Sequence, residues 1–312
     1  MWEQIHANRV KAVFLVMLMA LLLAAVGFAV GGPAGLAIAG GLWLILFLIS
    51  FYGGGNIFLA MSGAKKIERK DHPRLWNVVE EMVIAGGLPK MPDIYIIDDR
   101  SPNAFATGRD PNHSAVAVTS GLLSSLNRDE LQGVIAHEIS HIKNRDILLM
   151  VIVGVMLGTI VLIADATRRM MFYSGRSRRS SRDGGQGAAI MALLALVLIV
   201  LAPIFAQLIY FAISRKREYL ADASGATLTR YPEGLASALE KISSAAIPLS
   251  NVDRVTAPMY IANPMELGRA EASSLTSTHP PIARRVAILR SMGAGASYTD
   301  YQSAFRKVCG EG

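Results

Sequence analysis

Four long runs of apolar residues constrain the fold of this chain more than any other feature. None of the runs contains Lys, Arg, Asp or Glu; they cover Ala12–Val30, Gly35–Tyr52, Ile147–Ala164 and Ala188–Ala212. Each run is close to the roughly 20 helical residues that cross about 30 Å of hydrocarbon. The alternative, helices buried in a large soluble core, is hard to sustain because the rest of the chain offers too little to cover four such segments. The sequence therefore predicts an α-helical membrane protein.

The overall composition agrees with this prediction. The 312 residues are 52% hydrophobic and only 18% charged, which is too apolar for an ordinary soluble domain. The first run exceeds the roughly 7–15 residues of a signal-peptide core, and a second run follows almost at once, so we expect it to be retained. Cys309 is the single cysteine, which excludes an intramolecular disulfide and favours a reducing compartment for the soluble parts.

The net charge of +7 is concentrated beside the apolar runs. The loop Asp165–Gly187 contains six arginines, and the stretch Lys65–Asp71 contains four basic residues. A basic stripe on a soluble domain would indicate nucleic-acid binding, whereas basic residues that flank membrane segments contact anionic lipid head groups. We therefore expect the lipid bilayer as a partner and no nucleic acid.

A tight turn at Gly31-Gly32-Pro33 separates the first two runs, which predicts an N-terminal transmembrane hairpin over residues 1–60. Basic residues precede and follow this hairpin, so the positive-inside rule places its ends and the following domain in the cytoplasm. The same rule conflicts with a second crossing hairpin over residues 147–212, because its basic loop would then lie outside. Either the rule fails for these later spans, or the second hydrophobic hairpin dips into the bilayer or packs beside the soluble domain.

The segment after the N-terminal hairpin has the pattern of a mixed α/β unit. Apolar residues at helical spacing predict a helix over His72–Gly86. Three short strands are expected to follow, at Ile94–Ile97, Ala104–Thr107 and Ala115–Thr119. Asn127 with Glu130 forms the N-cap pair of a second helix, which we expect to run straight on towards the third apolar run.

The second helix carries the sequence His137-Glu138-Ile139-Ser140-His141. Histidines four residues apart lie on one face of a helix and can bind a single metal ion. The glutamate beside them suits peptide hydrolysis, because zinc polarises a water and the scissile carbonyl while the carboxylate passes the water's proton to the departing amine. The motif predicts one Zn²⁺ per chain, with His137 and His141 as ligands and Glu138 catalytic. Two surface histidines on an ordinary helix are the alternative.

A third protein ligand is expected downstream. The metzincin arrangement is excluded because Asn144 and Ile147 stand where that motif needs Gly and His. Among the later glutamates we choose Glu218, because a hairpin of the third and fourth runs would bring it level with the two histidines. Asp222, one helical turn beyond Glu218, can accept the second N–H of a zinc-bound imidazole. The alternative for both carboxylates is a solvated acidic face beside Arg215–Arg217.

The motif HEISH, followed after an apolar hairpin by EYLAD at Glu218–Asp222, resembles the HtpX family of membrane-bound heat-shock proteases, relatives of the CAAX prenyl proteases. The resemblance covers nearly the whole chain, because the N-terminal spans, PNAFATG at Pro102–Gly108, both zinc motifs and THPP at Thr278–Pro281 occur in the family's order. It implies a mixed α+β, gluzincin-like zinc metalloprotease domain with the ligands and catalytic glutamate named above. It also implies a multi-pass protein of the bacterial inner membrane that removes misfolded or damaged membrane proteins on the cytoplasmic side, without ATP.

The resemblance extends to a His-Pro element near the metal. In related enzymes an arginine stands six residues after this histidine, and here the pair matches His279 and Arg285, both of which could stabilise the developing oxyanion. The neighbouring Arg284 is an alternative to Arg285. A simple helix start, with Pro280 and Pro281 fixing the turn and His279 capping the helix, would explain the segment equally well.

The PNAFATG segment is expected, from the same resemblance, to form an edge strand. Its residues Asn103, Ala104 and Phe105 would bind the substrate backbone by strand addition, reading shape more than side chains. The alternative is a plain core strand with Phe105 inside.

We therefore expect a membrane anchor that carries one zinc protease domain, assembled from residues 61–146 and 213–312. The second hydrophobic hairpin, residues 147–212, separates the two blocks, which form one domain because the expected ligands come from both. The expected partners are unfolded or damaged membrane proteins, and a homo-oligomer is compatible with the sequence. Two rival functions remain: a processing protease for one modified peptide, and a zinc-bound scaffold or chaperone that holds unfolded segments without cutting them.

Overall fold

The computed structural model describes residues 2–152, 197, 201, 215–245, 247, 249, 257–264 and 279–310. Most of the third and fourth apolar runs and the whole arginine-rich loop lie outside this part of the chain. The path of the second hydrophobic hairpin and its relation to the bilayer therefore stay predictions.

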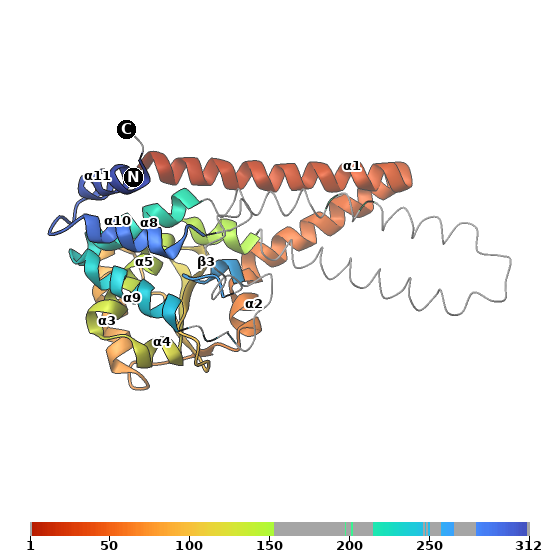
Figure 1. The fold of residues 1–312 in the computed structure, drawn as a ribbon. Helices are drawn as coiled ribbons and strands as arrows, with labels where there is room; N and C mark the ends of the chain where they lie inside the picture. The colour runs from red at the N-terminus through yellow and green to blue at the C-terminus, as the bar shows by residue number, and fades with distance from the viewer. Residues whose placement is uncertain are drawn as a thin grey trace, which may run out of the picture.

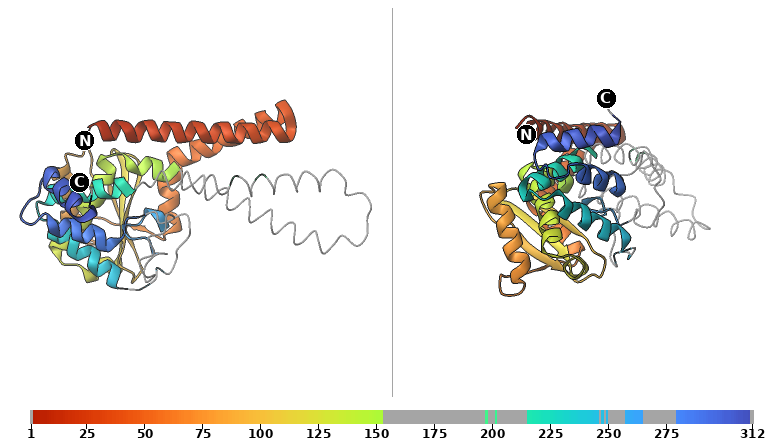
Figure 2. Two further views of the ribbon diagram at one scale, coloured as in Figure 1. Left: turned by 45° about the horizontal axis from the view of Figure 1, so that its top comes forward. Right: turned by 60° about the vertical axis from the view of Figure 1, so that its left-hand side comes forward.

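A helical hairpin opens the fold. Helix α1 spans Trp2–Leu48, and it reverses direction at Gly32, where φ is +56° and Pro33 follows (Figures 1 and 2). A positive φ suits glycine, which has no Cβ to clash with the backbone. The turn is therefore found where the sequence predicts it. The π-helical turn η1 (Ile49–Gly53) and helix α2 (Gly54–Met61) lead from the hairpin into the domain.

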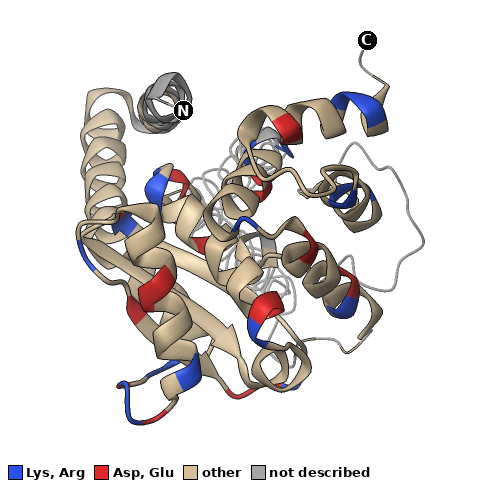
Figure 3. Cartoon of the chain, turned by 90° about the vertical axis from the view of Figure 1, so that its left-hand side faces the viewer, with Lys and Arg blue, Asp and Glu red and all other residues tan. Residues whose placement is uncertain are grey.

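Both arms of the hairpin present apolar side chains outward. Among the described residues, one helical segment, Gly32–Met61, is long and apolar enough to cross a membrane, and only 11% of its most apolar window is buried inside the protein. Exposed apolar side chains also occur on the first arm; they include Val13, Phe14, Met17, Leu21 and Phe28. Positions 12 to 64 hold no Lys, Arg, Asp or Glu, and Figure 3 shows the charged residues on the domain instead. Such a surface is stable against lipid rather than water.

A four-stranded sheet lies inside the domain. Its strands are β1 (Lys65–Lys66), β2 (Asp93–Ile97), β3 (Ala104–Asp110) and β4 (His113–Thr119), in the order β1-β2-β4-β3. Strands β2 and β4 are parallel, whereas the β1–β2 and β3–β4 pairs are antiparallel. The three strands expected from the sequence are confirmed, and β3 lies at an edge of this sheet.

Helix α5 (Arg128–Lys143) is the centre of the packing (Figure 1). Every residue of α5 from Gly133 to Ile142 is buried, because the sheet and several helices surround it. The other helices are α3 (Pro73–Gly86), α4 (Ser120–Ser125), α8 (Arg215–Thr229), α9 (Pro232–Ser244), the 3-10 turn η2 (Ala257–Met259), α10 (Ile282–Ser291) and α11 (Tyr298–Cys309). Side chains from before and after the second hydrophobic hairpin share one hydrophobic core.

Helix α5 begins as predicted but ends differently. Asn127 Oδ1 accepts a hydrogen bond from the N–H of Glu130 at 2.9 Å, and the Glu130 carboxylate accepts one from the N–H of Asn127 at 2.8 Å. The expectation that this helix runs straight on is wrong, because a turn at residues 144–145 interrupts it and Arg145 has a φ of +59°. Helical structure resumes at Asp146. The interruption lets the side chain of Asp146 reach back towards the end of α5.

Glu130 also ties α5 to α9, because its carboxylate accepts hydrogen bonds of 2.8 Å from both Ser237 and Lys241. Burial alone would raise the pKa of Glu130, but the hydrogen bonds from Lys241, Asn127 and Ser237 lower it below the ordinary value. We expect Glu130→Gln to reduce the free energy of unfolding by about 1–3 kcal/mol.

The pH dependence of this loss follows from the direction of the pKa shift. The pKa of Glu130 is lower in the folded than in the unfolded protein. The stability that Glu130→Gln removes is therefore fully present above the ordinary glutamate pKa, and it disappears as the pH falls through the folded-state pKa. Denaturant unfolding in detergent, at neutral pH and at the lowest pH where the protein stays folded, measures the difference. An equal loss at both pH values would contradict the assignment.

Candidate metal centre and active site

Helices α5 and α8 bring three side chains to one point. The Nε2 atoms of His137 and His141, both on α5, are 3.1 Å apart. Glu218 of α8 places its Oε2 3.6 Å from the Nε2 of His137 and its Oε1 3.5 Å from the Nε2 of His141. All three residues are buried, and their candidate ligand atoms lie within 4.8 Å of one another. The structure thus brings the three predicted ligands into one cluster.

Small residues on α8 allow this approach. A Cβ added at Gly225 would stand 3.2 Å from the backbone nitrogen of His137, which is tighter than an ordinary van der Waals contact. Ala221 and Ala226 of α8 are also fully buried. Because the backbones of α5 and α8 lie close together, the side chain of Glu218 is long enough to meet the two imidazoles.

The cluster has the dimensions of a metal site. A tetrahedral ion with bonds of about 2.0–2.1 Å separates its ligand atoms by about 3.4 Å. Here the two Nε2 atoms are 3.1 Å apart, and each lies close to a different oxygen of Glu218, at 3.5 and 3.6 Å. In addition, Oε2 of Glu218 and Oε1 of Glu138 are buried without a hydrogen-bond partner among the described residues. Buried acceptors of this kind need a positive charge or a water nearby, so the side chains fit a metal ion.

The charges around the cluster favour a cation. Burial opposes the protonation of His137, but Asp222 and Glu218 raise its pKa to about 9. Burial also opposes the ionisation of Glu218, yet the cationic side chains around it, His279 first among them, hold its pKa well below the ordinary value. The carboxylate is therefore ionised and draws protons to the imidazoles. A metal ion would displace those protons, because coordination needs neutral imidazole nitrogens.

Glu138 lies between the cluster and strand β3. It is buried, and its side chain accepts a hydrogen bond from the backbone N–H of Ala106. Burial raises the pKa of Glu138; the two histidines oppose this rise, and Glu218 adds to it. A carboxylate with a raised pKa takes up a proton more readily, which suits a general base.

Each histidine is held by a carboxylate on its other ring nitrogen. Asp222 Oδ1 lies 3.0 Å from the Nδ1 of His137, and Asp146 Oδ2 lies 3.1 Å from the Nδ1 of His141. These contacts fix the orientation of both rings and direct both Nε2 atoms to the centre of the cluster. Asp222 stands where the sequence predicts it, whereas sequence reasoning misses Asp146. The one sequence signal for Asp146 is Asn144, a residue type that is common at helix ends and stands two positions before it.

An arginine stands behind each of these carboxylates. Arg285 is fully buried and donates to Asp222 from Nε at 2.9 Å and from Nη2 at 2.8 Å, while its Nη1 donates to the carbonyl of Ile261 at 2.9 Å. The buried Arg217 places its Nε 3.9 Å from Oδ1 of Asp146. Buried bidentate contacts between arginine and carboxylate hold geometry strongly. A hydrogen-bonded arginine–aspartate–histidine chain therefore orients His137, whereas Arg217 stands near Asp146 as a charge and forms no hydrogen bond among the described residues.

We expect Asp146→Asn to weaken metal binding by about 10–100-fold, because an uncharged partner makes the His141 imidazole a poorer ligand. Competition with a chelator of known affinity measures this change. Asp129→Asn, an exposed position in the first turn of the same helix, is the matched control and should keep the affinity of the unmodified protein. Unchanged affinity in Asp146→Asn would show that the contact is structural only.

The predicted His-Pro element lies against the cluster. His279 is buried, and its Nε2 is 4.0 Å from Oε2 of Glu218. Helix α10 begins after Pro281, which occupies the N-cap, so the alternative in which His279 caps that helix is wrong. Arg285, and not the exposed Arg284, faces the site, with its Nη1 3.6 Å from Oε2 of Glu218. An oxyanion role for either residue stays a prediction.

The predicted substrate residues lie at the start of edge strand β3, and all three are buried. The side-chain Nδ2 of Asn103 donates to the carbonyl of Ala262 at 2.8 Å, and the carbonyl of Ala104 accepts from the N–H of Ile261 at 2.9 Å. Phe105 packs edge-on against the ring of Tyr260, with 5.1 Å between ring centres. The segment is therefore an edge strand whose first residues also belong to the core, and its role in substrate binding stays a prediction.

Comparison with known proteins places this geometry in a family. The model of "Peptidase family M48" matches residues 69–293, which is well over half of the chain and includes the whole cluster. The chain belongs to peptidase family M48. It is 48% identical over 300 residues to a "Protease HtpX homolog" from Dictyoglomus turgidum, a match that covers 94% of this chain and 95% of that protein. A "Protease HtpX homolog" from Lactobacillus helveticus is 42% identical over 301 residues, covering 94% and 100%.

The fold of this M48 protein is also similar to a solved structure. The crystal structure of Ste24p from S. mikatae matches with a TM-score of 0.50 and 20% sequence identity, covering 93% of this chain and 67% of that one. At this identity the likeness concerns the fold alone. The family match, the HtpX homologues, the histidine–glutamate cluster and the apolar helix together identify a membrane metalloprotease, so the resemblance inferred from the motifs is confirmed.

Proposed function

We propose that this M48 protein is a zinc endopeptidase of the bacterial inner membrane that hydrolyses misfolded or damaged membrane proteins on the cytoplasmic side. One observation carries the proposal: two histidines and a glutamate from two helices converge, with Glu138 between them and an edge strand. Two histidines and a glutamate form the ligand set of gluzincin-like proteases and leave a fourth position for water. Nitrogen donors favour zinc over magnesium or calcium, which prefer oxygen ligands alone.

The chain's own residues supply the steps around the metal. A zinc ion held by the three ligands would polarise a water molecule and the scissile carbonyl. Glu138 accepts a proton from that water and delivers it to the departing amine nitrogen. His279, buried beside Glu218, donates a hydrogen bond to the oxygen on which charge develops. Arg285 acts through Asp222 as a positioning residue, because its guanidinium is engaged there on two nitrogens.

The part of the β3 edge that the segment 260–262 leaves uncovered is the proposed substrate-binding surface. Alternate residues of an edge strand turn their backbone groups away from the neighbouring strand. Ala104 and Ala106 do so. The carbonyl of Ala104 accepts a hydrogen bond from the segment 260–262, and the N–H of Ala106 donates one to Glu138. An extended substrate paired along this edge would pass directly beside the catalytic carboxylate. Recognition through the backbone suits unfolded chains of many sequences, with Asn103 and Phe105 supporting the edge from within.

The orientation in the membrane is part of the proposal. Basic residues flank the apolar hairpin, which favours a cytoplasmic position for the catalytic domain formed by residues 61–146 and 213–312. Helix α2 joins the hairpin directly to the sheet, so the active site is held close to the bilayer, where damaged membrane proteins expose unfolded segments.

Metal analysis and proteolysis of the full chain, purified in detergent, test the proposal. We expect about one zinc ion per chain, cleavage of an unfolded protein, loss of cleavage with a chelator and recovery when zinc is restored. A scaffold would bind the unfolded protein without cutting it, and a processing protease would cut only one modified peptide. Cleavage that persists after complete removal of metal would overturn the proposal.

A further inference from the structure

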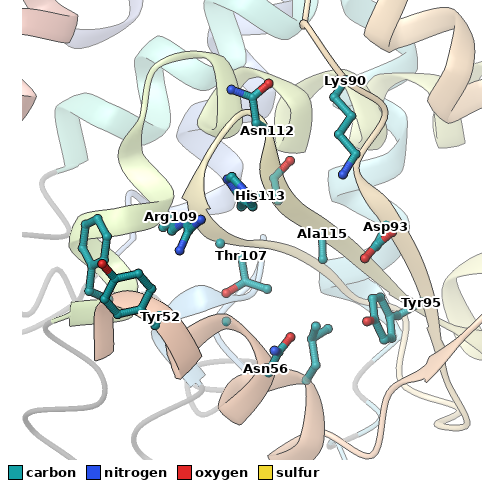
Figure 4. A pocket seen from close by; sticks show the side chains of 15 residues that line it. Tyr52, Asn56, Lys90, Asp93, Tyr95, Thr107, Arg109, Asn112, His113 and Ala115 are labelled. Atoms are coloured by element: carbon teal, nitrogen blue, oxygen red, sulfur yellow. The ribbon is translucent and has the colours of Figure 1, made fainter. Parts of the chain in front are cut away.

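A polar cavity of about 240 Å³ lies between the sheet and the helix that enters the domain (Figure 4). Phe51 and Tyr52 line it from the helix, and Thr107 and Arg109 line it from β3. Lys90, from the loop before β2, lines the cavity from a third side. No residue of the metal cluster borders this cavity within the described part of the chain.

The cavity and the metal cluster lie on opposite faces of the sheet. Successive side chains of a strand point to opposite faces. In β3, Ala104 and Ala106 belong to the core around α5, whereas Phe105 packs with Phe58 of α2. Thr107 follows on this second face. The cavity is therefore a separate site on the side of the sheet that the membrane helix covers.

The helical wall of the cavity lies at the end of the apolar helix Gly32–Met61. One turn before this wall, the ring of Phe47 stacks on that of Phe51, with ring centres 5.8 Å apart. The next residue, Tyr52, is 66% exposed. Aromatic side chains, Trp and Tyr above all, collect at the level of the lipid head groups. The cavity is thus placed at head-group depth.

Two cations border the cavity. The guanidinium of Arg109 lies over the rings of Phe51 at 5.8 Å and Tyr52 at 5.3 Å, which holds it against the helical wall. The side chain of Lys90 extends towards the cavity (Figure 4) and forms no hydrogen bond or ion pair with any residue that the structure describes. Lys90 is therefore available to an anion that enters from outside, and Arg109 adds a second positive charge at the wall.

The neighbouring acidic groups do not compete with such an anion. Asp93 pairs with Lys66 at 2.9 Å, and Asp110 pairs with the ring of His113 at 3.0 Å and with Arg109 at 3.4 Å. Oγ1 of Thr107, by contrast, is buried and has no hydrogen-bond partner among the described residues. The wall therefore offers Lys90, which has no partner among the described residues, and Arg109, whose charge is shared with Asp110, with the buried hydroxyl of Thr107 behind them.

We infer that this cavity binds the phosphate of an anionic phospholipid head group. Arginine and lysine bind phosphate oxygens through charge-assisted hydrogen bonds. The cavity is smaller than the ~300–1,000 Å³ that encloses a whole small-molecule ligand, so it suits a head group alone. The acyl chains would lie along the exposed apolar side chains of the helix, such as Ile45, Leu48 and Ile49. A lipid bound in this way would hold the sheet at a constant distance from the surface of the bilayer.

Lipid retention by the full chain in detergent tests the inference. Native mass spectrometry would count bound phosphatidylglycerol, with phosphatidylcholine and inorganic phosphate as comparison probes. We expect phosphatidylglycerol to be retained, and the double variant Lys90→Gln/Arg109→Gln to bind it roughly tenfold more weakly or worse. Lys90→Gln alone, at an exposed position that does not support the fold, should give part of this loss. Thermal unfolding of each variant shows whether its fold is intact.

A matched control separates a built site from general charge attraction. Arg306→Gln/Lys307→Gln removes the same charge from exposed positions of α11, outside the cavity and away from the basic stretches that flank the apolar runs, and should leave lipid retention unchanged. An equal loss in this control, or full retention in Lys90→Gln/Arg109→Gln, would overturn the inference. Inorganic phosphate that binds with the same dependence on Lys90 and Arg109, while phosphatidylglycerol does not, would overturn the lipid assignment in favour of a soluble phosphate compound.

Discussion

Glu138→Gln is expected to lower kcat/KM for cleavage of an unfolded protein by about 10²–10⁴-fold while the zinc content stays unchanged. Glutamine has the shape of glutamate, and its amide oxygen can still accept the hydrogen bond from the N–H of Ala106. It cannot take up the proton of the attacking water, because an amide is not a base at neutral pH. Glu138 is not one of the three clustered ligands, so metal binding should be preserved.

The measurement pairs a quenched fluorescent unfolded substrate with elemental analysis of the same preparation. Glu240→Gln, an exposed glutamate on α9, is the matched control and should retain full activity. If the protein were a scaffold that works without hydrolysis, the Glu138→Gln variant would keep the function of the unmodified protein. Cleavage by Glu138→Gln at the rate of the unmodified protein would therefore remove the general-base assignment.

The parts of the fold that sequence reasoning predicts are those encoded locally. The strands β2, β3 and β4 each have a short apolar run bounded by turn residues, and α5 has its capping pair at Asn127 and Glu130. The hairpin turn at Gly32 follows from residues that favour it in isolation. The spacing of His137 and His141 is also local, since one helical turn places both on the same face.

The parts that sequence reasoning misses depend on contacts between distant segments. The interruption of α5 places Asp146 against His141, and nothing in the helical pattern requires that interruption. Arg285 reaches Asp222 only because α10 packs beside α8, although the two residues are far apart in the chain. Sequence reasoning treats the PNAFATG segment as either an edge strand or a core strand. In the fold the first residues of this segment lie on an edge strand and are also buried in the core, because the segment 260–262 covers that end of the edge.

Glu218→Gln is expected to lose metal as well as activity. Its carboxylate is the single charged ligand of the cluster, and both oxygens lie close to an imidazole Nε2, at 3.5 and 3.6 Å. Loss of an outer-shell partner typically reduces metal affinity by about 10–100-fold, and loss of a ligand should exceed this. We therefore expect zinc affinity to fall by more than roughly a hundredfold, with cleavage lost at ordinary zinc concentrations.

Chelator competition and proteolysis at increasing zinc concentration distinguish the two glutamates. Excess zinc should restore part of the activity of Glu218→Gln, because the two histidines still bind the ion weakly, but it should not rescue Glu138→Gln, whose site is already filled. Glu233→Gln, an exposed glutamate that pairs with Arg290 on the surface, should bind zinc as the unmodified protein does. If Glu218→Gln kept stoichiometric zinc at unchanged affinity, the third ligand would have to be another residue, and the proposed convergence of α5 and α8 on the metal would be wrong.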